Sequence, residues 1–392
     1  MLEYFVIATV AALLTHGYFA LRLLPPLADR VRVRRFLIAL LVANVLVLPA
    51  TLVATLRAPA SVAAWSVPIA HIAFADVGFC IVFTFALLLR DAVWFAMRGA
   101  SRVGVRTPID DPSRRVAMLG GLNAAVGAIA VTSTAVGYAE ALAEPMLRRV
   151  RIDVARMGTT SRPFRIVQVS DLHVGPTIRR DYVEALVRSV NRLDADAIVL
   201  TGDLVDGFVA QLRDQVEPLR ELRARHGVFV VTGNHEFFYG APEWVDAWRA
   251  MGLRVLDDEQ HVIEHDGRRV ALIGVNDEAR GGAHADRRAV IASARSESNA
   301  ADVKILLAHR PSDAEHAAAL GIDVQLSGHI HAGQFVPLAW LVRRVEPYFA
   351  GLYRVGGMQL YVNRGAGYWG PPNRLGAQQE ITLVEVSGTG RA

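Results

Sequence analysis

Residues 164–175 of the chain read FRIVQVSDLHVG. The run begins with a short apolar segment rich in β-branched side chains, which predicts a buried β-strand. That strand would end just before Asp171 and His173, which are two positions apart and therefore share one face of an extended chain. Carboxylate and imidazole groups are ligands that borderline divalent metals prefer. The stretch therefore predicts a strand whose carboxyl end presents two metal ligands.

The same pattern recurs four times further along the chain. AIVLT precedes Gly202-Asp203, VFVVT precedes Gly233-Asn234-His235-Glu236, VKILLA precedes His309, and IDVQLS precedes Gly328-His329-Ile330-His331. Open α/β sheets place their ligand sites outside the carboxyl ends of the strands. We therefore expect the five polar clusters to meet at one edge of a sheet and to form a metal site.

The second cluster, TGDLVD at residues 201–206, adds Asp203 to the candidate ligands. Gly202 permits a tight turn where the backbone must approach the site. We expect Asp206 to lie behind the ligands or to cap a helix, and not to be a ligand itself.

The third cluster, residues 233–236, is the most discriminating of the five. Asn234 can offer its amide oxygen to a metal, whereas the neighbouring His235 points elsewhere and is free for proton transfer. Glu236 either orients that imidazole or begins the next helix. Taken alone, these residues would be a Gly-Asn turn followed by an exposed histidine. Their place after other strand-end ligands favours a catalytic site.

The remaining candidate ligands are histidines. His309, His329 and His331 supply neutral imidazoles that complete two coordination spheres. Five other histidines of the C-terminal half fit no such context, and we expect them to be solvated or structural. They are His226, His261, His265, His284 and His316.

From about residue 162 onward, short β-branched runs alternate with helical ones, as in FRIVQVS followed by YVEALVRSVNRL. This alternation predicts an α/β fold in which helices flank a sandwich of sheets. The chain has a net charge of +4, and this half has no basic stripe interleaved with aromatics, which argues against nucleic acid as a partner. The single cysteine, Cys80, excludes an intramolecular disulfide.

The N-terminal third holds most of the hydrophobic excess of the chain. Apolar stretches cover about residues 4–23, 36–56, 67–89 and 116–139, and each approaches or exceeds the length that crosses a bilayer as a helix. We therefore predict a bundle of about four transmembrane helices. His71 and Asp76 fit either an ion path or a polar contact between packed helices, and we favour the contact.

The distribution of arginines predicts how this bundle is oriented across the membrane. Residues 22–35 and 90–115, which adjoin the predicted helices, are rich in arginine, and the positive-inside rule places them in the cytoplasm. The C-terminal half would then face outward from the inner or plasma membrane. The arginines of residues 148–156 oppose this orientation. Ser113-Arg114-Arg115, which resembles a twin-arginine export signal, supports it.

In the order D-x-H, G-D-x-x-D, G-N-H-E, H and G-H-x-H, the clusters resemble the calcineurin-like metallophosphoesterase superfamily over about residues 164–386. The resemblance implies a four-layer αββα sandwich. We expect a transmembrane anchor at residues 1–145, a linker at 146–162 and the metallophosphoesterase domain at 163–388. SDLHVG, LSGHIHAGQ and YVNRGAG resemble a bacterial membrane-associated branch. That branch includes exported cell-wall phosphoesterases and UDP-diacylglucosamine pyrophosphohydrolases.

The resemblance also implies two divalent metal ions, each manganese, zinc or iron. One would be held by Asp171, His173 and His331, and the other by Asn234, His309 and His329, with Asp203 bridging them. The implied enzyme hydrolyses a phosphate ester or pyrophosphate bond through a metal-activated hydroxide. His235 would protonate the departing oxygen.

A catalytic domain behind membrane helices meets amphiphiles at high local concentration, so membrane lipids and lipid-linked or cell-envelope phosphates are candidate substrates. Residues 335–355, FVPLAWLVRRVEPYFAGLYRV, form either an apolar, basic lip for the bilayer or an acyl chain, or ordinary loop packing. Two other classes compete with an enzyme. One is a membrane sensor or scaffold that only binds a phosphorylated ligand. The other is a transporter with an attached hydrolase, for which Asp76 is the hint; the oligomeric state stays open.

Overall fold

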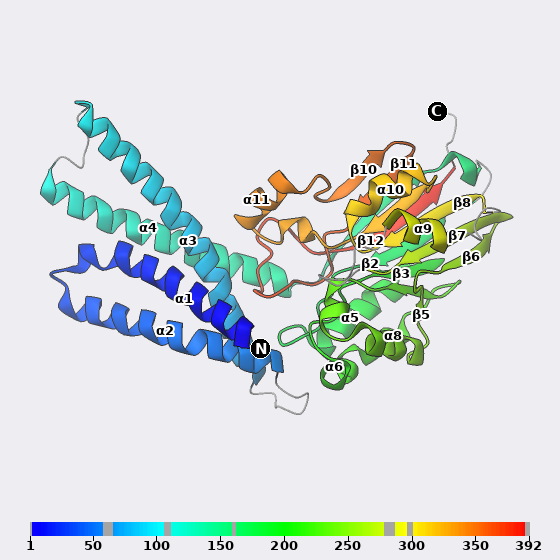
Figure 1. The fold of residues 1–392 in the computed structure, drawn as a ribbon, viewed down its shortest axis with the longest axis horizontal. Coiled ribbons are helices and arrows are strands. Elements are labelled where there is room, and N and C mark those ends of the chain that lie inside the picture. The colour runs from blue at the N-terminus through cyan, green and yellow to red at the C-terminus, as the bar shows by residue number, and fades with distance from the viewer. Residues whose placement is uncertain are drawn as a thin grey trace. The chain divides into compact units, whose positions relative to one another are not determined.

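The computed structural model describes residues 2–57, 66–105, 111–158, 162–277, 287–295 and 301–388. The chain divides into two compact units. The first is helical and takes in most of residues 1–139 together with 370–375. The second is built on β-sheets and takes in residues 140–369 and the C-terminal segment from 376. Figure 1 shows the elements of both units along the chain.

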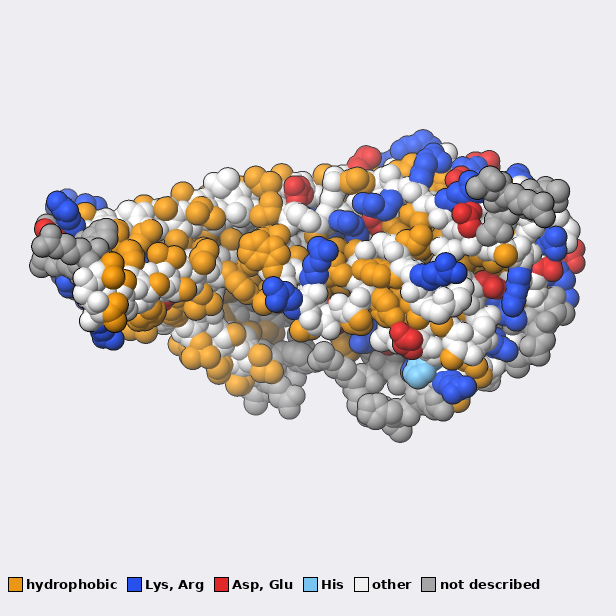
Figure 2. All heavy atoms as spheres, turned by 90° about the horizontal axis from the view of Figure 1, so that it is seen from above, with side chains coloured by type: hydrophobic (Ala, Val, Ile, Leu, Met, Phe, Trp, Pro, Cys, Tyr) orange, Lys and Arg blue, Asp and Glu red, His pale blue; other side chains and the backbone are white. Residues whose placement is uncertain are grey.

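The helical unit consists of α1 (Leu2–Leu23), α2 (Val31–Arg57), α3 (Ser66–Arg102) and most of α4 (Pro112–Leu142). Among the described residues, four helices are long and apolar enough to cross a membrane, and they match the four predicted stretches. Hydrophobic side chains cover most of their surface on the face shown in Figure 2. A water-soluble bundle would bury these side chains, so the chain is integrated in a membrane.

α3 is longer than the sequence suggested. It runs for 37 residues, past the expected end at residue 89 to Arg102. Arg90, Arg98 and Arg102 therefore lie on a helix and not in a loop, which corrects the sequence interpretation. Arg90 is buried, and its Nη1 lies 2.6 Å from Oδ1 of Asp91. Asp91 thereby compensates this charge within the apolar surroundings.

Several polar side chains inside the helical unit are paired between helices. The amide of Asn44 on α2 donates to Asp76 on α3 over 3.0 Å. His71 on α3 and the hydroxyl of Tyr138 on α4 are 3.1 Å apart. These are polar contacts between packed helices, the interpretation that the sequence favoured for His71 and Asp76.

The second unit contains two six-stranded sheets. The order of the first is β1 (Met146–Asp153), β12 (Glu380–Ser387), β2 (Phe164–Val169), β3 (Ala197–Thr201), β4 (Val228–Val231) and β5 (Arg254–Val255). The order of the second is β10 (Gly351–Val355), β11 (Met358–Val362), β9 (Val324–Ser327), β8 (Val303–Ala308), β7 (Arg268–Val275) and β6 (Gln260–His265). Strands β2 to β5 run parallel to one another, as do β7, β8 and β9.

The helices of this unit flank the sheets. They are α5 (Arg180–Asn191), α6 (Val209–Val216), α7 (Asn234–Phe238), α8 (Ala241–Ala250), α9 (Arg287–Ala294), α10 (Ala314–Ala319) and α11 (Leu338–Val345). Val183, Leu186 and Val190 recur at helical spacing on α5 and pack against the outer face of the first sheet. Ile291 of α9 and Ala317 of α10 cover the second sheet in the same way.

A separate core lies between the two sheets. Ile166 of β2 and Phe229 of β4 meet Ile305 of β8 there. Val167, the neighbour of Ile166, faces the helices instead, because side chains alternate along a strand. Three cores between four layers make an αββα sandwich, so the predicted fold class is confirmed.

The segment expected to be a linker begins with a strand. Residues 146–153 form β1, which pairs in parallel with β12 at the edge of the first sheet. Nε of Arg148 on this strand lies 2.8 Å from Oε2 of Glu380 on β12. Residues 146–153 are therefore part of the sandwich, and the arginines that looked like membrane flanks belong to its edge.

Candidate metal centre

The five polar clusters follow β2, β3 and β4 of the first sheet and β8 and β9 of the second. Backbone hydrogen bonds join the loops that carry them. The amide of Asp171 donates to Gly202 over 3.0 Å, and that of His173 donates to Asp203 over 3.1 Å. The amide of Gly328 donates to His309 over 2.9 Å. The strands thus deliver the clusters to one place, as the sequence predicted.

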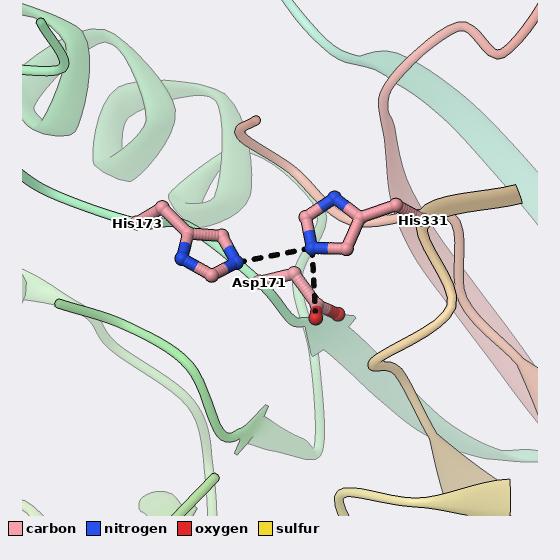
Figure 3. A group of neighbouring side chains, drawn as sticks. All are labelled: Asp171, His173 and His331. Atoms are coloured by element: carbon pink, nitrogen blue, oxygen red, sulfur yellow. Dashed lines mark hydrogen bonds and ion pairs between the residues drawn. The ribbon is translucent and has the colours of Figure 1, made fainter. Parts of the chain in front are cut away.

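The first group of side chains comprises Asp171, His173 and His331, whose ligand atoms lie within 4.8 Å of one another. Figure 3 shows the two imidazoles facing each other above the carboxylate. Nε2 of His173 is 3.0 Å from Nε2 of His331, which is 3.2 Å from Oδ1 of Asp171. All three residues are buried.

A second group comprises Asp203, His309 and His329. Nε2 of His309 lies 3.1 Å from Oδ2 of Asp203 and 3.2 Å from Nδ1 of His329. The same carboxylate oxygen of Asp203 lies 4.0 Å from Nε2 of His173 in the first group. Asp203 therefore stands between the two groups.

The amide oxygen of Asn234 is buried and has no hydrogen-bond partner among the described residues. Leaving a buried acceptor unsatisfied costs about 1–3 kcal/mol, so such an atom needs an explanation. A cation bound beside Asp203 and His309 would satisfy it. The observation fits a metal site that Asn234 helps to form.

Two histidines are held so that their free nitrogens point into the site. Nδ1 of His309 lies 2.8 Å from the carbonyl oxygen of Thr201, which can only accept a hydrogen bond. Nδ1 therefore carries a proton, and Nε2 of His309 faces Asp203. In the same way, Nδ1 of His173 faces Oδ1 of Asp206 at 2.9 Å. Both histidines therefore present Nε2 to the site while a partner behind the ring holds Nδ1, which is the usual arrangement of a metal-ligating imidazole.

The pKa values of the buried groups also indicate that this site favours positive charge. Burial alone would lower the pKa of His309, but the carboxylates of Asp203, Asp171 and Asp277 outweigh it and raise the pKa to about 10. Burial likewise opposes ionisation of Asp203, yet the surrounding His309, His235 and His173 hold its pKa well below the usual value. The buried carboxylates thus demand positive charge around them.

His235 lies beside the two groups. Its Nδ1 is 2.6 Å from Oδ1 of Asp206, and its backbone amide donates to Oδ1 of Asp203 over 2.8 Å. Its Nε2 points to the other oxygen of Asp203, 3.9 Å away. Burial would lower the pKa of His235, but Asp206 and Asp203 raise it to about 9. His235 also forms a close group with His173 and Asp203.

Glu236 lies in the first turn of α7, one of its two expected roles, and its carboxylate also acts beyond this helix. Its carboxylate accepts backbone amides of Asp203, Leu204 and Gly233 at 2.7–3.0 Å and so ties the second cluster to the third. Asp206, and not Glu236, holds the imidazole of His235. The expectation that Asp206 lies behind the ligands agrees with this geometry. The structure further shows that one oxygen of Asp206 serves both His173 and His235.

The backbone of the site is strained. Asp171, His173, Asp203, His329 and His331 all have positive φ angles, between 52° and 71°. Non-glycine residues adopt this region rarely, at a cost of about 1–3 kcal/mol each, and such residues cluster at functional sites. Gly202, with φ of 87°, passes so close to Gly233 that a Cβ would lie 2.6 Å from its nitrogen. The predicted tight turn is present there.

Sequence reasoning missed several groups around the site. Arg310, which follows His309 directly, forms an ion pair with Asp277 at 2.7 Å. Trp369 lies 5.8 Å from His235 between ring centroids. The proximity of Arg310 to His309 in the chain was a usable signal. Trp369 carried none, because it is far from every cluster in sequence.

A further His and Asp group lies outside the site. Asp196, His226 and His265 are close together, but Asp196 is already paired with Arg162 at 2.8 Å. The structural role expected for both histidines agrees with this pairing. His261 contacts Arg254, and His316 lies on α10. His284 lies outside the described residues.

Comparisons with known proteins agree with this geometry. Residues 164–333 match the family model of the calcineurin-like phosphoesterases. The chain is 34% identical over 256 residues to a transmembrane protein with a metallophosphoesterase domain from Danio rerio, covering 63% of this chain and 59% of that protein. It is 31% identical over 239 residues to an uncharacterized metallophosphoesterase of Aquifex aeolicus, covering 58% of this chain and 86% of the relative.

The chain spans 59–66% of the length of the three curated relatives from Danio rerio, Bos taurus and Helicobacter pylori. Among solved structures, a putative 5'-nucleotidase from Staphylococcus aureus gives a TM-score of 0.37 at 16% identity, covering 58% of this chain and 55% of that one. The relatives include animal as well as bacterial proteins. The match is therefore to the superfamily, and the bacterial branch expected from the sequence is not singled out.

Proposed function

The chain belongs to the calcineurin-like phosphoesterases, a family of metal-dependent phosphoesterases, and we propose that it is a membrane-anchored dinuclear enzyme that hydrolyses a phosphate ester or pyrophosphate bond. One observation carries the proposal. Asp171, His173 and His331 form one group of potential ligands, Asp203, His309 and His329 form another, and Oδ1 of Asn234 has no partner among the described residues. Two cations would compensate them together.

Seven residues would hold the ions. Asp171, His173 and His331 would hold one, Asn234, His309 and His329 the other, and Asp203 would contact both. When bound, the ions would supply a water activated near neutral pH and charge neutralisation for the phosphoryl oxygens. Manganese, zinc and iron suit this mixture of imidazole and oxygen donors.

The protein's own residues would position the ligands and move a proton. Asp206 fixes the imidazoles of His173 and His235 through Nδ1, which leaves Nε2 of both facing the site. Nε2 of His235 would donate its proton to the departing oxygen, a role worth about 10²–10⁴-fold in rate. Glu236 would keep Asp203 and the turn at Gly233 in place through the backbone amides that it accepts.

The substrate that we propose is amphiphilic, a lipid-linked or cell-envelope phosphate. α11 begins shortly after His331 and exposes Trp340, Leu341 and Val345, with Trp340 65% accessible. Arg343 and Arg344 lie on the same short helix. An exposed apolar surface with adjacent arginines suits a lipid interface better than ordinary loop packing. The membrane helices would hold the enzyme where such substrates occur.

We propose further that the catalytic unit faces outward from the inner or plasma membrane, on the support of the arginines near the ends of the helices. Ala250→Cys on α8 and Ala28→Cys between α1 and α2 would form a matched pair of exposed positions. A membrane-impermeant maleimide applied to intact cells should label the first variant alone. Labelling of the second alone would reverse the orientation. Cys80, the native cysteine, is buried.

The activity is tested with the full chain in lipid nanodiscs, loaded with Mn²⁺. A generic aryl phosphate ester should be hydrolysed, and chelation should stop the reaction until Mn²⁺ is restored. A metal-loaded chain that binds the ester or its product without turning it over would instead support the sensor or scaffold. Incubation with a total membrane lipid extract, followed by the phosphorus species that disappear, would then identify the natural substrate.

A further inference from the structure

Aromatic side chains surround the proposed proton donor. The ring of His235 lies 5.3 Å from that of Phe238, 5.8 Å from Trp369 and 6.5 Å from Tyr239. The ring of Phe208 lies 5.6 Å from that of Tyr239. We call Phe208, Phe238, Tyr239 and Trp369 the aromatic rim. His235 itself is buried, and the rim lies beside it.

The rim is unusually exposed for side chains of this size. Trp369 is 57% accessible, Phe208 54% and Phe238 47%. Scattered apolar residues are normal on a protein surface, but several large ones around a buried polar site mark a place for an apolar ligand. Their position beside His235 makes this surface continuous with the proposed active site.

The rim is also held in place. The side chain of Gln334 donates to the carbonyl of Trp369 over 2.8 Å and accepts its amide over 2.9 Å. Phe238 ends α7, the helix that begins at Asn234. The amide of Phe208 donates to Gln211 over 3.1 Å at the start of α6. Phe208, Phe238 and Trp369 are thus exposed and held by hydrogen bonds or by a helix, as a preorganised binding surface would be.

We propose, on the basis of the proposed function, that the aromatic rim binds the leaving group of the substrate and that this group is an alcohol carrying an alkyl chain. Hydrolysis would break the bond between phosphorus and the ester oxygen, with water supplying the new oxygen on phosphorus. The ester oxygen would take the proton from Nε2 of His235 and depart with the chain as an alcohol. The rim lies beside His235, where that alcohol is released.

The geometry favours a flexible chain over a flat base. The rings of Phe208 and Tyr239 are inclined by 88° and those of His235 and Trp369 by 80°, so neither pair provides parallel faces for stacking a nucleobase. The amide of Gln334 is engaged by the backbone of Trp369 at both ends. The rim therefore offers apolar contact and leaves no amide from Gln334 for the edge of a base.

The test uses the full chain in nanodiscs with Mn²⁺ and a series from ethyl to hexyl phosphate, each at a concentration where it is monomeric. kcat/KM should rise by up to about fourfold for each methylene that reaches the rim. Trp369→Ala and Phe238→Ala should flatten this dependence, and Trp369→Phe should keep most of it. Leu352→Ala, which removes an exposed apolar side chain on β10, is the matched control and should keep the wild-type dependence.

The outcomes separate the two proposals. If the wild type hydrolyses none of these esters nor an aryl phosphate, the proposed function itself fails. If it hydrolyses them with no dependence on chain length, the function stands and the rim proposal is wrong. A larger effect of Trp369→Ala on a nucleoside monophosphate than on hexyl phosphate would also overturn the alkyl chain, in favour of a base.

Discussion

The helical unit and the metal centre both bury charged and polar side chains, but they do so in opposite ways. In the helices, Asp91 lies 2.7 Å from Nε of Arg22, 2.6 Å from Nη1 of Arg90 and 2.9 Å from the hydroxyl of Tyr18. In the metal centre, nitrogen faces nitrogen between His173 and His331, and the amide oxygen of Asn234 faces no partner. In the helices a single buried carboxylate is surrounded by three partners, whereas in the centre several carboxylates and imidazoles from separate loops are gathered around one another, as in a cation site.

This difference teaches how to tell structural from functional polar residues. A buried carboxylate paired with opposite charge, as at Asp91 or Asp196, is complete as it stands. A set of carboxylates and imidazoles that strained backbone brings together from separate loops is instead arranged as a cation site. The central claim is therefore that the residues around Asp203 form a binding site for two divalent ions. Variants of the two regions should behave differently.

The largest effect is expected for Asp203→Ala, because this carboxylate contacts both groups of ligands. kcat/KM should fall by more than about 10³-fold, and at least one equivalent of metal should be lost. Phosphate release and elemental analysis of the full chain measure the two quantities. Asp214→Ala, which removes an exposed carboxylate on α6, is the control and should match the wild type. Retention of both metals by Asp203→Ala would contradict its bridging role.

His235→Ala should reduce turnover by about 10³-fold while the metal content stays unchanged, since His235 is assigned to proton transfer and not to ligation. The same two measurements apply. Two results would contradict the assignment of His235 to proton transfer. Loss of a metal equivalent would make His235 a ligand, as its close grouping with His173 and Asp203 allows. Wild-type turnover would show that no proton from His235 is needed.

Asp206→Ala should cost about 10–100-fold in activity or metal affinity, because Asp206 orients ligands without being one. Both His173 and His235 lose the acceptor of Nδ1 in this variant. A titration with Mn²⁺ should show weaker binding at the site formed by Asp171, His173 and His331. The same samples should show a lowered kcat. An unchanged titration with unchanged kcat would mean that packing alone positions the two imidazoles.

The smallest effect is expected in the helices. Asp76→Asn keeps a hydrogen-bonding group opposite Asn44, so phosphate release should stay within about twofold of the wild type. Reconstituted vesicles should show no ion flux with either protein. Flux in the wild type that disappears in Asp76→Asn would revive the transporter with an attached hydrolase.

Much of the sandwich and the identities of the clustered residues could be read from the sequence, because short apolar runs and their polar ends are local signals. FRIVQV and VKILLA became β2 and β8 as predicted. The strand β1 was missed because Arg148, Arg149 and Arg151 made residues 146–153 resemble a membrane flank. Its partner β12 also lies far away in the chain, so the pairing has no local signature.

The shared role of Asp206 was equally hidden. Its contacts with His173 and His235 depend on three loops meeting in space, and only the positive φ angles of residues such as Asp171 make that meeting possible. Spacing along the chain does not encode such angles. The exposure of Trp340 and Leu341 on α11 also needed the fold, since the apolar sequence alone fitted loop packing equally well.

The most direct test of the central claim is a metal titration of the full chain after chelation, with bound Mn²⁺ and phosphate release recorded in the same samples. We predict that the wild type binds two equivalents and that turnover appears as they bind. We predict that Asn234→Ala, which deletes the unsatisfied oxygen, binds one tightly. A wild type that binds no Mn²⁺, or that hydrolyses aryl phosphate fully without it, would contradict the account.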